Sequence, residues 1–566
     1  MKKMITSIML AFLAVPLMAQ SITDGEQRIV PQKNQELERL YQQERQLENT
    51  GTPEQMNALR LAIKDTWAKV DPELAALYKP MAPGVLPAVR EGNYEIQDLP
   101  EWGKDLLLRE GWIDYVSIDV TAAGVIYVAA TENYTGASGD DTSLYIYRSS
   151  DGGVSFSLWK NLNILGETGR KLKIVSMDGA GDEYLLAYMA TEAKNFFGIR
   201  INMADGTFVT GGGIGGVEDF DVDRNFPINT SSQLVMLTYT KLDAACTTGG
   251  STRSTRSMGG SYGFDWVDDH EIIGCGRDTA FAYGTGGATY VAFIGGNSGS
   301  IRAAANPNFN DPNSWGSLAT VELGTAKETK EVRIVAARNE ITLDEVLILA
   351  SSRPTGSSDN WKGQGYKRTN GGAYSPFTYL NAVSTLNVRH IDSWVRREVG
   401  ANTIQTSYVR EVIDGSSNNA NRSMRYVNGA LESYDEVADS DVNVFHNMPS
   451  AIAQKSDAVP IMAFAGTDGN FGKNLYFDAK DNVLAIEENN LEGFSIYPNP
   501  TDGILNFSAV KTIENMTVYS LLGQKVMELA VSNTVGSVDV SPLSTGVYLV
   551  KVEVEGQIGT YKFIKQ

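Results

Sequence analysis

The stretch YIYRSSDGGVSF, residues 145–156, contains the pattern that decides the fold of this chain. Its first half alternates aromatic or apolar residues with others, which is typical of a β-strand with one buried face. Asp151, Gly152 and Gly153 follow, and such residues tolerate the positive φ of a tight reversal between antiparallel strands. Phe156 comes directly after the turn. The stretch therefore predicts a strand, a tight turn and a second strand with an aromatic anchor.

Related units recur along the chain. Six further turns rich in Gly, Asn or Asp follow an Arg or Phe at intervals of 46 to 66 residues. An apolar strand precedes each turn, and these strands are expected at 125–131, 184–191, 234–240, 289–295, 345–352, 403–410 and 459–466. Several short strands per period are typical of propeller blades. We predict a mainly β fold with a seven-bladed β-propeller at 111–489, with six or eight blades as alternatives.

The opening stretch also resembles a known motif. Ser149, Asp151, Gly153, Ser155 and Phe156 match the Asp-box, the S-x-D-x-G-x-S/T-aromatic turn of sialidase-like propellers. In that family the box lies at the blade periphery, away from the active site. Asp and Ser can hold such a turn by hydrogen bonds to the backbone while the aromatic packs beneath. We assign the motif a structural role, with a catalytic role as the alternative.

The end of the chain, residues 490–566, has the alternation and proline-bounded turns of a separate domain of six or seven short strands. We expect an Ig-like β-sandwich. Four ordered blocks resemble the type A C-terminal sorting domain of type IX secretion cargo. The matching residues are Tyr497, Pro498, Asn499, Pro500, Gly503, Gly523, Gly546, Tyr548 and Lys562. The resemblance implies passage through the periplasm, handling by an outer-membrane translocon and its sorting machinery, and delivery to the cell surface or medium. Cleavage of the tail, and anchoring or release of the cargo, stay open.

The beginning of the chain has the pattern of an export signal. Two lysines precede a mostly apolar run at 4–18, which predicts a signal peptide at 1–19. Apolar residues at helical spacing then predict a helical hairpin within 20–82. A proline-rich linker is expected at 83–110. No later segment reaches the ~20 apolar residues that a membrane-spanning helix needs.

Composition narrows the classes of partner. The chain has 566 residues, enough for several domains with separate cores. It carries 48 Lys and Arg against 68 Asp and Glu, a formal net charge of −20. An acidic protein repels phosphate backbones, and no basic run offsets this, so a nucleic-acid partner is not expected.

The two cysteines, Cys246 and Cys275, are 29 residues apart in a chain that is expected to be exported. This predicts one disulfide, with two buried free thiols as the alternative.

Candidate metal ligands are few. The three histidines have no metal-ligand spacing, which argues against a zinc hydrolase. Asp219, Asp221 and Asp223 lie on one face of a predicted strand, and Ca²⁺ prefers such oxygen clusters. A solvated acidic face is the alternative explanation. We expect no cofactor, with Ca²⁺ as the one candidate.

The pattern assigns no catalytic residue. A sialidase needs three converging arginines, a Tyr–Glu pair and an acid/base Asp, and the family's Arg-Ile-Pro signature is missing. Arg389, Arg396 and Arg397 cluster in sequence, which does not establish convergence in space. The predicted function is a secreted or cell-surface propeller that binds a glycan or protein ligand. A sialidase-like glycoside hydrolase and a structural or adhesion component of the surface are the alternatives.

Overall fold

The structure is a computed structural model that describes residues 21–24, 102–480 and 494–565 with short internal gaps, and single positions between 36 and 69. The described residues are mainly β-strand. Two compact units divide the chain, Met1–Lys480 and Asp481–Gln566. The predicted signal peptide at 1–19 and nearly all of the predicted helical region at 20–82 lie outside the described residues. The first described segment of that region, Ser21–Asp24, is a strand.

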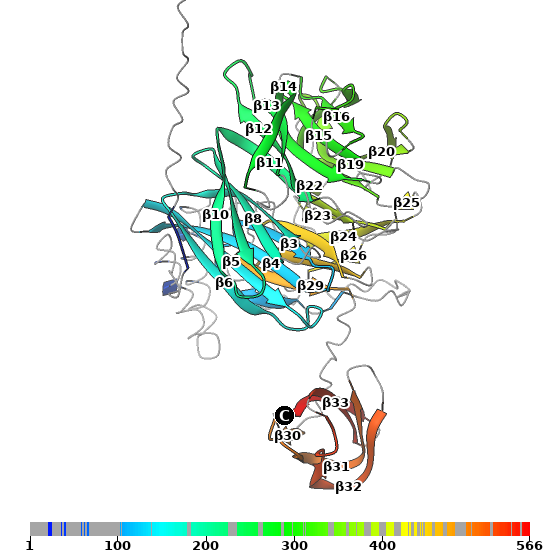
Figure 1. The fold of residues 1–566 in the computed structure, drawn as a ribbon. Coiled ribbons are helices and arrows are strands. Elements are labelled where there is room, and N and C mark those ends of the chain that lie inside the picture. The colour runs from blue at the N-terminus through cyan, green and yellow to red at the C-terminus, as the bar shows by residue number, and fades with distance from the viewer. Residues whose placement is uncertain are drawn as a thin grey trace, which may run out of the picture. The chain divides into compact units, whose positions relative to one another are not determined.

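The described residues of the first unit form six antiparallel sheets, which follow one another along the chain (Figure 1). The first has the order β1-β6-β5-β4-β3, with β1 (Ser21–Asp24), β3 (Tyr115–Val120), β4 (Ile126–Gly136), β5 (Gly139–Ser149) and β6 (Ser157–Leu165). The second has the order β10-β9-β8-β7, with β7 (Gly169–Met177), β8 (Tyr184–Thr191), β9 (Asn195–Asn202) and β10 (Phe208–Gly215).

The third sheet runs from β11 to β17 in chain order and has more strands than any other described sheet. It consists of β11 (Val217–Arg224), β12 (Val235–Leu242), β13 (Gly250–Ser257), β14 (Trp266–Tyr283), β15 (Thr289–Gly295), β16 (Ile301–Asn306) and β17 (Ala319–Glu322). The 18-residue strand β14 pairs with β13 through its first part and with β15 from Gly276 onward. It therefore closes one group of four strands and opens the next.

Three further sheets complete the first unit. One contains β18 (Lys327–Ala336), β19 (Glu345–Pro354), β20 (Lys362–Thr369) and β21 (Ser375–Phe377). The next contains β22 (Leu386–Val395), β23 (Ile404–Val412), β24 (Ala420–Val427), β25 (Ala430–Leu431) and β26 (Asp435–Glu436). The last has the order β2-β29-β28-β27, with β2 (Leu106–Arg109), β27 (Ser450–Gln454), β28 (Pro460–Gly466) and β29 (Asn474–Ala479).

A closed ring of strands lies at the centre of this unit. Each of the strands β3, β7, β11, β14, β18, β22 and β27 contacts the next, and β27 contacts β3. We call these the inner strands. Apolar clusters fill the spaces between successive sheets, and one of them joins Val116 and Ile118 of β3 to Ile461 and Phe464 of β28. Sheets packed face to face around a ring are the architecture of a β-propeller.

The last sheet of the ring is completed at its outer edge by a strand from the N-terminal side. β2 pairs with β29 in the last sheet, although it lies inside the stretch that the sequence assigned to a linker at 83–110. Its residues Leu106, Leu107 and Leu108 are apolar, and a four-residue strand is too short for the alternation to be recognised from sequence. Pairing with β29 covers an edge that would otherwise expose unpaired backbone groups.

The second unit is a small β domain with its own core. It contains β30 (Ser495–Tyr497), β31 (Ile504–Ser520), β32 (Lys525–Asp539), β33 (Gly546–Val554) and β34 (Gln557–Lys565) in one five-stranded sheet. The sequence predicted six or seven short strands in a sandwich. The described residues of this unit form five, because β31 and β32 are long and continue through irregularities in their pairing.

The two cysteines are bonded to each other. Cys246 follows β12 and Cys275 lies in β14, and their sulfur atoms form a disulfide. We expect the same pairing in protein collected from the medium. The disulfide closes a loop between cysteines 29 residues apart, which stabilises the fold by about 3 kcal/mol in the chain-entropy model. Intact mass after alkylation without reduction measures it. Two alkylated cysteines would contradict the pairing, and reduction before alkylation is the positive control.

Candidate ligand-binding channel

The inner strands surround a cavity of about 270 Å³. Its lining comes from every inner strand, from Tyr115 on β3 to Ser450 and Ala451 on β27. It therefore occupies the centre of the ring, and we call it the channel. Besides aromatic groups such as Tyr283 and Trp394, its lining contains many charged side chains. These are Asp119, Asp219, Asp221, Asp223, Asp278 and Asp392, with Arg170, Lys171, Lys173 and Arg333.

Most of these carboxylates connect one inner strand to the next. In each case a carboxylate oxygen accepts a hydrogen bond from a backbone N–H of the following inner strand. The pairs are Asp119 with Ser176, Asp219 with Thr279, Asp221 with Phe281, Asp278 with Val332, and Asp392 with Ile452. The inner edge of each inner strand has no strand beside it, so its N–H groups need such partners. The aspartates therefore hold neighbouring sheets together.

Strand β7 departs from this pattern. Ser117 and Asp119 on β3, and Asp219 and Asp221 on β11, are acceptors spaced two residues apart. β7 instead presents two basic side chains, Lys171 and Lys173. Lys171 Nζ lies 2.8 Å from Asp219 Oδ1, which shows that the two positions face each other across the sheet boundary. An ammonium cannot accept a hydrogen bond, so the lysines of β7 cannot bind the backbone N–H groups of β11, the next inner strand.

The strand that follows β7 compensates with its own aspartates. Asp221 Oδ1 accepts from the N–H of Val222, and Asp223 Oδ1 accepts from the N–H of Arg224. Asp219, Asp221 and Asp223, the candidate Ca²⁺ ligands, therefore bond to protein groups. Within the described part of the chain, no group of three or more His, Cys, Asp or Glu side chains is placed to hold a metal ion. Backbone satisfaction explains why this strand is rich in aspartate.

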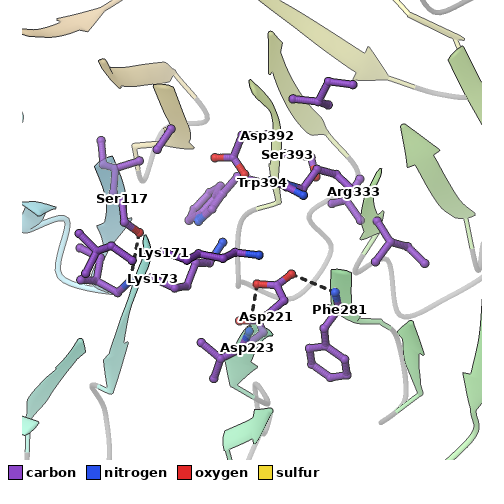
Figure 2. Close-up of a pocket in the computed structure, with 18 of the residues that line it drawn as sticks. Ser117, Lys171, Lys173, Asp221, Asp223, Phe281, Arg333, Asp392, Ser393 and Trp394 are labelled. Atoms are coloured by element: carbon purple, nitrogen blue, oxygen red, sulfur yellow. Dashed lines mark hydrogen bonds between the residues drawn. The ribbon is translucent and has the colours of Figure 1, made fainter. Parts of the chain in front are cut away.

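Lys173 is the cation most available to a ligand. Figure 2 shows Lys171 and Lys173 extending into the channel toward Asp221, with Asp392 and Arg333 on the side opposite to Asp221 and Asp223. Among the described residues the side chain of Lys173 has no ion pair or hydrogen bond, whereas Lys171 is paired with Asp219. Burial works against its charge, but Asp221, Asp392 and Asp223 outweigh burial and hold the pKa of Lys173 above its ordinary value. It is a charged donor at neutral pH.

A second polar group in the channel also has no protein partner. Ser450 is 8% exposed and lines the channel, and its Oγ forms no hydrogen bond with a described residue. A buried hydroxyl without a partner costs free energy unless a ligand or water satisfies it. The Oγ atom is itself buried from solvent, so it does not indicate a guest in the channel, and Lys173 is the group that does.

The inner strands are also distorted beside the channel. β-Bulges interrupt β14 at Arg277–Ala280 and β22 at Arg389–Asp392. Within them Asp278 has φ of 48° and His390 has φ of 49°, the left-handed region that non-glycine residues rarely adopt. Both side chains line the channel. Bulges of this kind redirect side chains near functional sites.

The residues of the Asp-box lie outside the channel lining. Asp151 Oδ1 accepts from Ser149 Oγ at 2.7 Å and from the N–H of Ser155 at 3.0 Å, and Ser149 Oγ accepts from the N–H of Gly153. The rings of Phe156 and Phe477 lie 4.6 Å apart. The box thus closes the β5–β6 turn and packs on β29 in the last sheet.

Gly153 has a specific reason to be glycine. Its φ is 94°, and a Cβ atom there would lie 2.7 Å from the ring of Phe477. A side chain would be strained and would collide with the aromatic pair.

We expect Asp151→Ala to lower stability and to leave the channel's function intact. Burial raises the pKa of Asp151, but hydrogen bonds from Ser155 and Ser149 outweigh it, so the pKa lies below its ordinary value. Such a carboxylate stabilises the fold above the unfolded-state pKa of ~3.9 and loses this effect as pH falls through the folded-state pKa. The loss at neutral pH should be about 1 kcal/mol, and it should shrink in acid. Urea unfolding of both proteins at neutral pH and at a pH below the folded-state pKa of Asp151 tests this. An unchanged midpoint with lost ligand binding would instead make the box a functional site.

Of the three arginines considered for a sialidase, Arg389 lies among the described residues. Arg389 Nε lies 3.8 Å from Glu331 Oε1, and Arg396 and Arg397 lie outside the described residues. The described lining of the channel contains two arginines, Arg170 and Arg333, and no glutamate. A sialidase constellation requires a third arginine and a Tyr–Glu pair.

Sequence reasoning missed the channel residues Lys173, Arg333, Asp392 and Ser450. One signal was present in RKLKIVSM, where two lysines alternate with apolar residues in a strand that begins a propeller unit. An inner strand has little contact with solvent, so charged residues there needed an explanation.

The motif residues of the second unit fall partly in the described region. Tyr497 is 48% exposed and Tyr548 is 9% exposed, with its hydroxyl bonded to the carbonyl of Ser544. Gly503 and Gly546 are described, Pro500 and Gly523 are not, and Lys562 lies on β34.

The closed ring of antiparallel sheets around a channel defines the first unit as propeller-like. The second unit identifies the route of the protein, because residues 495–566 match the family of secretion system C-terminal sorting domains. The protein is therefore cargo of the type IX secretion system, delivered to the cell surface or extracellular space. Within the described residues no helix is long and apolar enough to cross a membrane.

Similarities outside the sorting domain are remote. No curated protein sequence matches the chain. An α-L-arabinanase of Penicillium chrysogenum complexed with arabinobiose has 9% identity and a TM-score of 0.39, covering 67% of this chain and 98% of its own. AofleA of Arthrobotrys oligospora has 8% identity and a TM-score of 0.34, covering 81% and 91%. The β-propeller domain of the Trilobed protease of Pyrococcus furiosus has 8% identity and a TM-score of 0.36, covering 66% and 98%. At this level none of them carries an argument about function.

Proposed function

We propose that this protein is a secreted propeller that binds a glycan in its central channel. The observation that carries the proposal is Lys173, a charged donor without an ion pair, in a channel that also holds carboxylate acceptors. Sugar hydroxyls both donate and accept, so they can satisfy such a mixed lining.

The size and aromatic content of the channel support a small sugar unit. Its volume of about 270 Å³ lies near the lower end of the ~300–1,000 Å³ typical of small-molecule sites. Trp394 and Tyr283 supply apolar ring surface beside the polar groups, a combination that suits one or two sugar units better than a folded protein partner.

We further propose seven blades. This number is supported by the inner strands β3, β7, β11, β14, β18, β22 and β27 and by the division of β14 between two groups of four strands. The last blade would combine β27, β28 and β29 with the N-terminal strand β2.

A glycan array and a panel of fluorogenic glycosides, applied to protein purified from the medium, test the function. We expect binding without release of the fluorophore, and loss of binding in Lys173→Met. Lys241→Met, which removes an exposed lysine on β12, is the matched control. Release of fluorophore would favour the sialidase-like hydrolase. No binding to any glycan would overturn the proposal and leave a structural or adhesion role.

A further inference from the structure

We infer that the channel accepts neutral sugars and rejects sugars that carry a carboxylate. The inference rests on the proposed function and specifies the class of ligand. The inference is based on the balance and arrangement of charge around Lys173. An acidic sugar, a neutral sugar and an amino sugar differ mainly in their electrostatic interaction with these charged groups.

The lining contains an excess of negative charge. Six aspartates face four basic side chains, an excess of two carboxylates. Burial raises the pKa of Asp278, and even with Asp278 neutral one carboxylate remains in excess. A ligand carboxylate would enter a confined space that is already negative, where like charges repel more strongly than in bulk water.

The cations in the channel do not compensate for this excess. Lys171 is paired with Asp219 at 2.8 Å, and Arg170 is paired with Glu218 at 3.3 Å. Arg333 lies 3.6 Å from Asp278. Lys173 has hydrogen-bond capacity to spare, but Asp221, Asp392 and Asp223 already neutralise its charge. It can donate to a hydroxyl or ring oxygen without offering a net positive site for an acid.

A cationic sugar meets the opposite situation, because the excess of carboxylates attracts a ligand ammonium. The inference therefore excludes only sugars that carry a carboxylate. A neutral polyol avoids the repulsion that a carboxylate meets, and it can donate to the carboxylates while accepting from Lys173.

Asp392 provides the sharpest test. Its Oδ2 accepts from the N–H of Ile452 at 3.0 Å, and its charge helps to neutralise Lys173. In Asp392→Asn the amide oxygen can keep the hydrogen bond to Ile452, so the sheets stay connected while one negative charge is lost. The substitution should therefore change selectivity and leave the fold intact. Asp205→Asn, in the exposed β9–β10 turn, removes the same charge far from the lining.

The probes are methyl glycosides of glucose, galactose and mannose, each compared with its uronic acid and its 2-amino-2-deoxy form. Binding to the full secreted protein is measured by calorimetry at low salt and neutral pH. We expect at least one neutral glycoside to bind about tenfold or more tightly than its uronic acid. Asp392→Asn should reduce that ratio severalfold, and Asp205→Asn should not change it.

The outcomes separate the two proposals. Tighter binding of a uronic acid than of its neutral form would overturn the inference and leave glycan binding intact. Tighter binding of an amino sugar would support the excess of negative charge in the channel. An unchanged ratio in Asp392→Asn, with a wild-type melting curve, would also overturn it. If neither these probes nor any array glycan binds, the proposed function fails, and the inference falls with it.

Discussion

Deletion of residues 490–566 should abolish export almost completely and leave the rest of the protein in the periplasm. The deleted segment contains the whole sorting domain at 495–566. The remainder should stay folded, because the buried core of the second unit is built from its own residues, such as Leu505, Val518 and Phe563. Cell fractionation and accessibility to external protease measure the result.

The matched experiment transfers the same segment to another protein. A soluble periplasmic reporter that carries residues 490–566 at its C-terminus should become accessible at the surface or appear in the medium. The unmodified reporter is the control for leakage. Normal surface display of the truncated protein would contradict the role of the tail, whatever the reporter does.

Replacement of Arg109 by Met should cause the largest loss of stability among the single substitutions considered. Arg109 lies on β2, the strand that closes the last sheet. Its Nη2 lies 2.9 Å from Glu132 Oε2 and donates to the Tyr145 hydroxyl at 2.8 Å. The side chain of Glu132 is 1% exposed, so Arg109→Met leaves a buried carboxylate without its cation. Breaking a buried pair in this way costs about 3–5 kcal/mol.

A second substitution shows whether the stranded charge is the cause. In Arg109→Met with Glu132→Gln the buried group is neutral and its side-chain oxygen can still accept from the N–H of Trp112. This double variant should recover much of the loss. Arg39→Met is the matched control, because Arg39 and Glu36 form an exposed pair with side chains 52% and 57% exposed. Such pairs contribute ~0–1 kcal/mol.

Urea unfolding followed by tryptophan fluorescence gives the midpoints. A loss below 1 kcal/mol in Arg109→Met would contradict the prediction and show that the buried pair of Arg109 and Glu132 contributes little to stability. Equal losses in the single and double variants would mean that packing of the arginine, rather than the stranded carboxylate, accounts for the effect.

The sequence was informative wherever a local pattern reports a local structure. All seven predicted apolar strands coincide with strands of the first unit, from 125–131 in β4 to 459–466 in β28. Burial on both faces keeps such a strand apolar throughout, so its own residues reveal it. The sorting domain was recognised for a related reason, because its motif blocks are short and lie in one continuous segment.

The sequence was uninformative where the cause lies in distant residues. β2 looked like linker because its four residues become a strand only through pairing with β29, more than 360 residues away in the chain. The sequence suggested a calcium site at Asp219, Asp221 and Asp223 because it does not reveal the backbone N–H groups that these carboxylates bind. Those of Thr279 and Phe281 lie on another inner strand, and that of Val222 lies at the unpaired edge of β11.

The sequence by itself thus determined the strands, the repeated blade-like units and the route of export, all of which follow from short-range periodicity and contiguous motifs. Only the tertiary structure decided that Lys173, Asp221, Asp392 and Ser450 line one channel. The physical reason is that the lining is assembled from residues of all the inner strands, which lie far apart in the chain. Their proximity depends on closure of the ring, and no spacing along the chain encodes that distance.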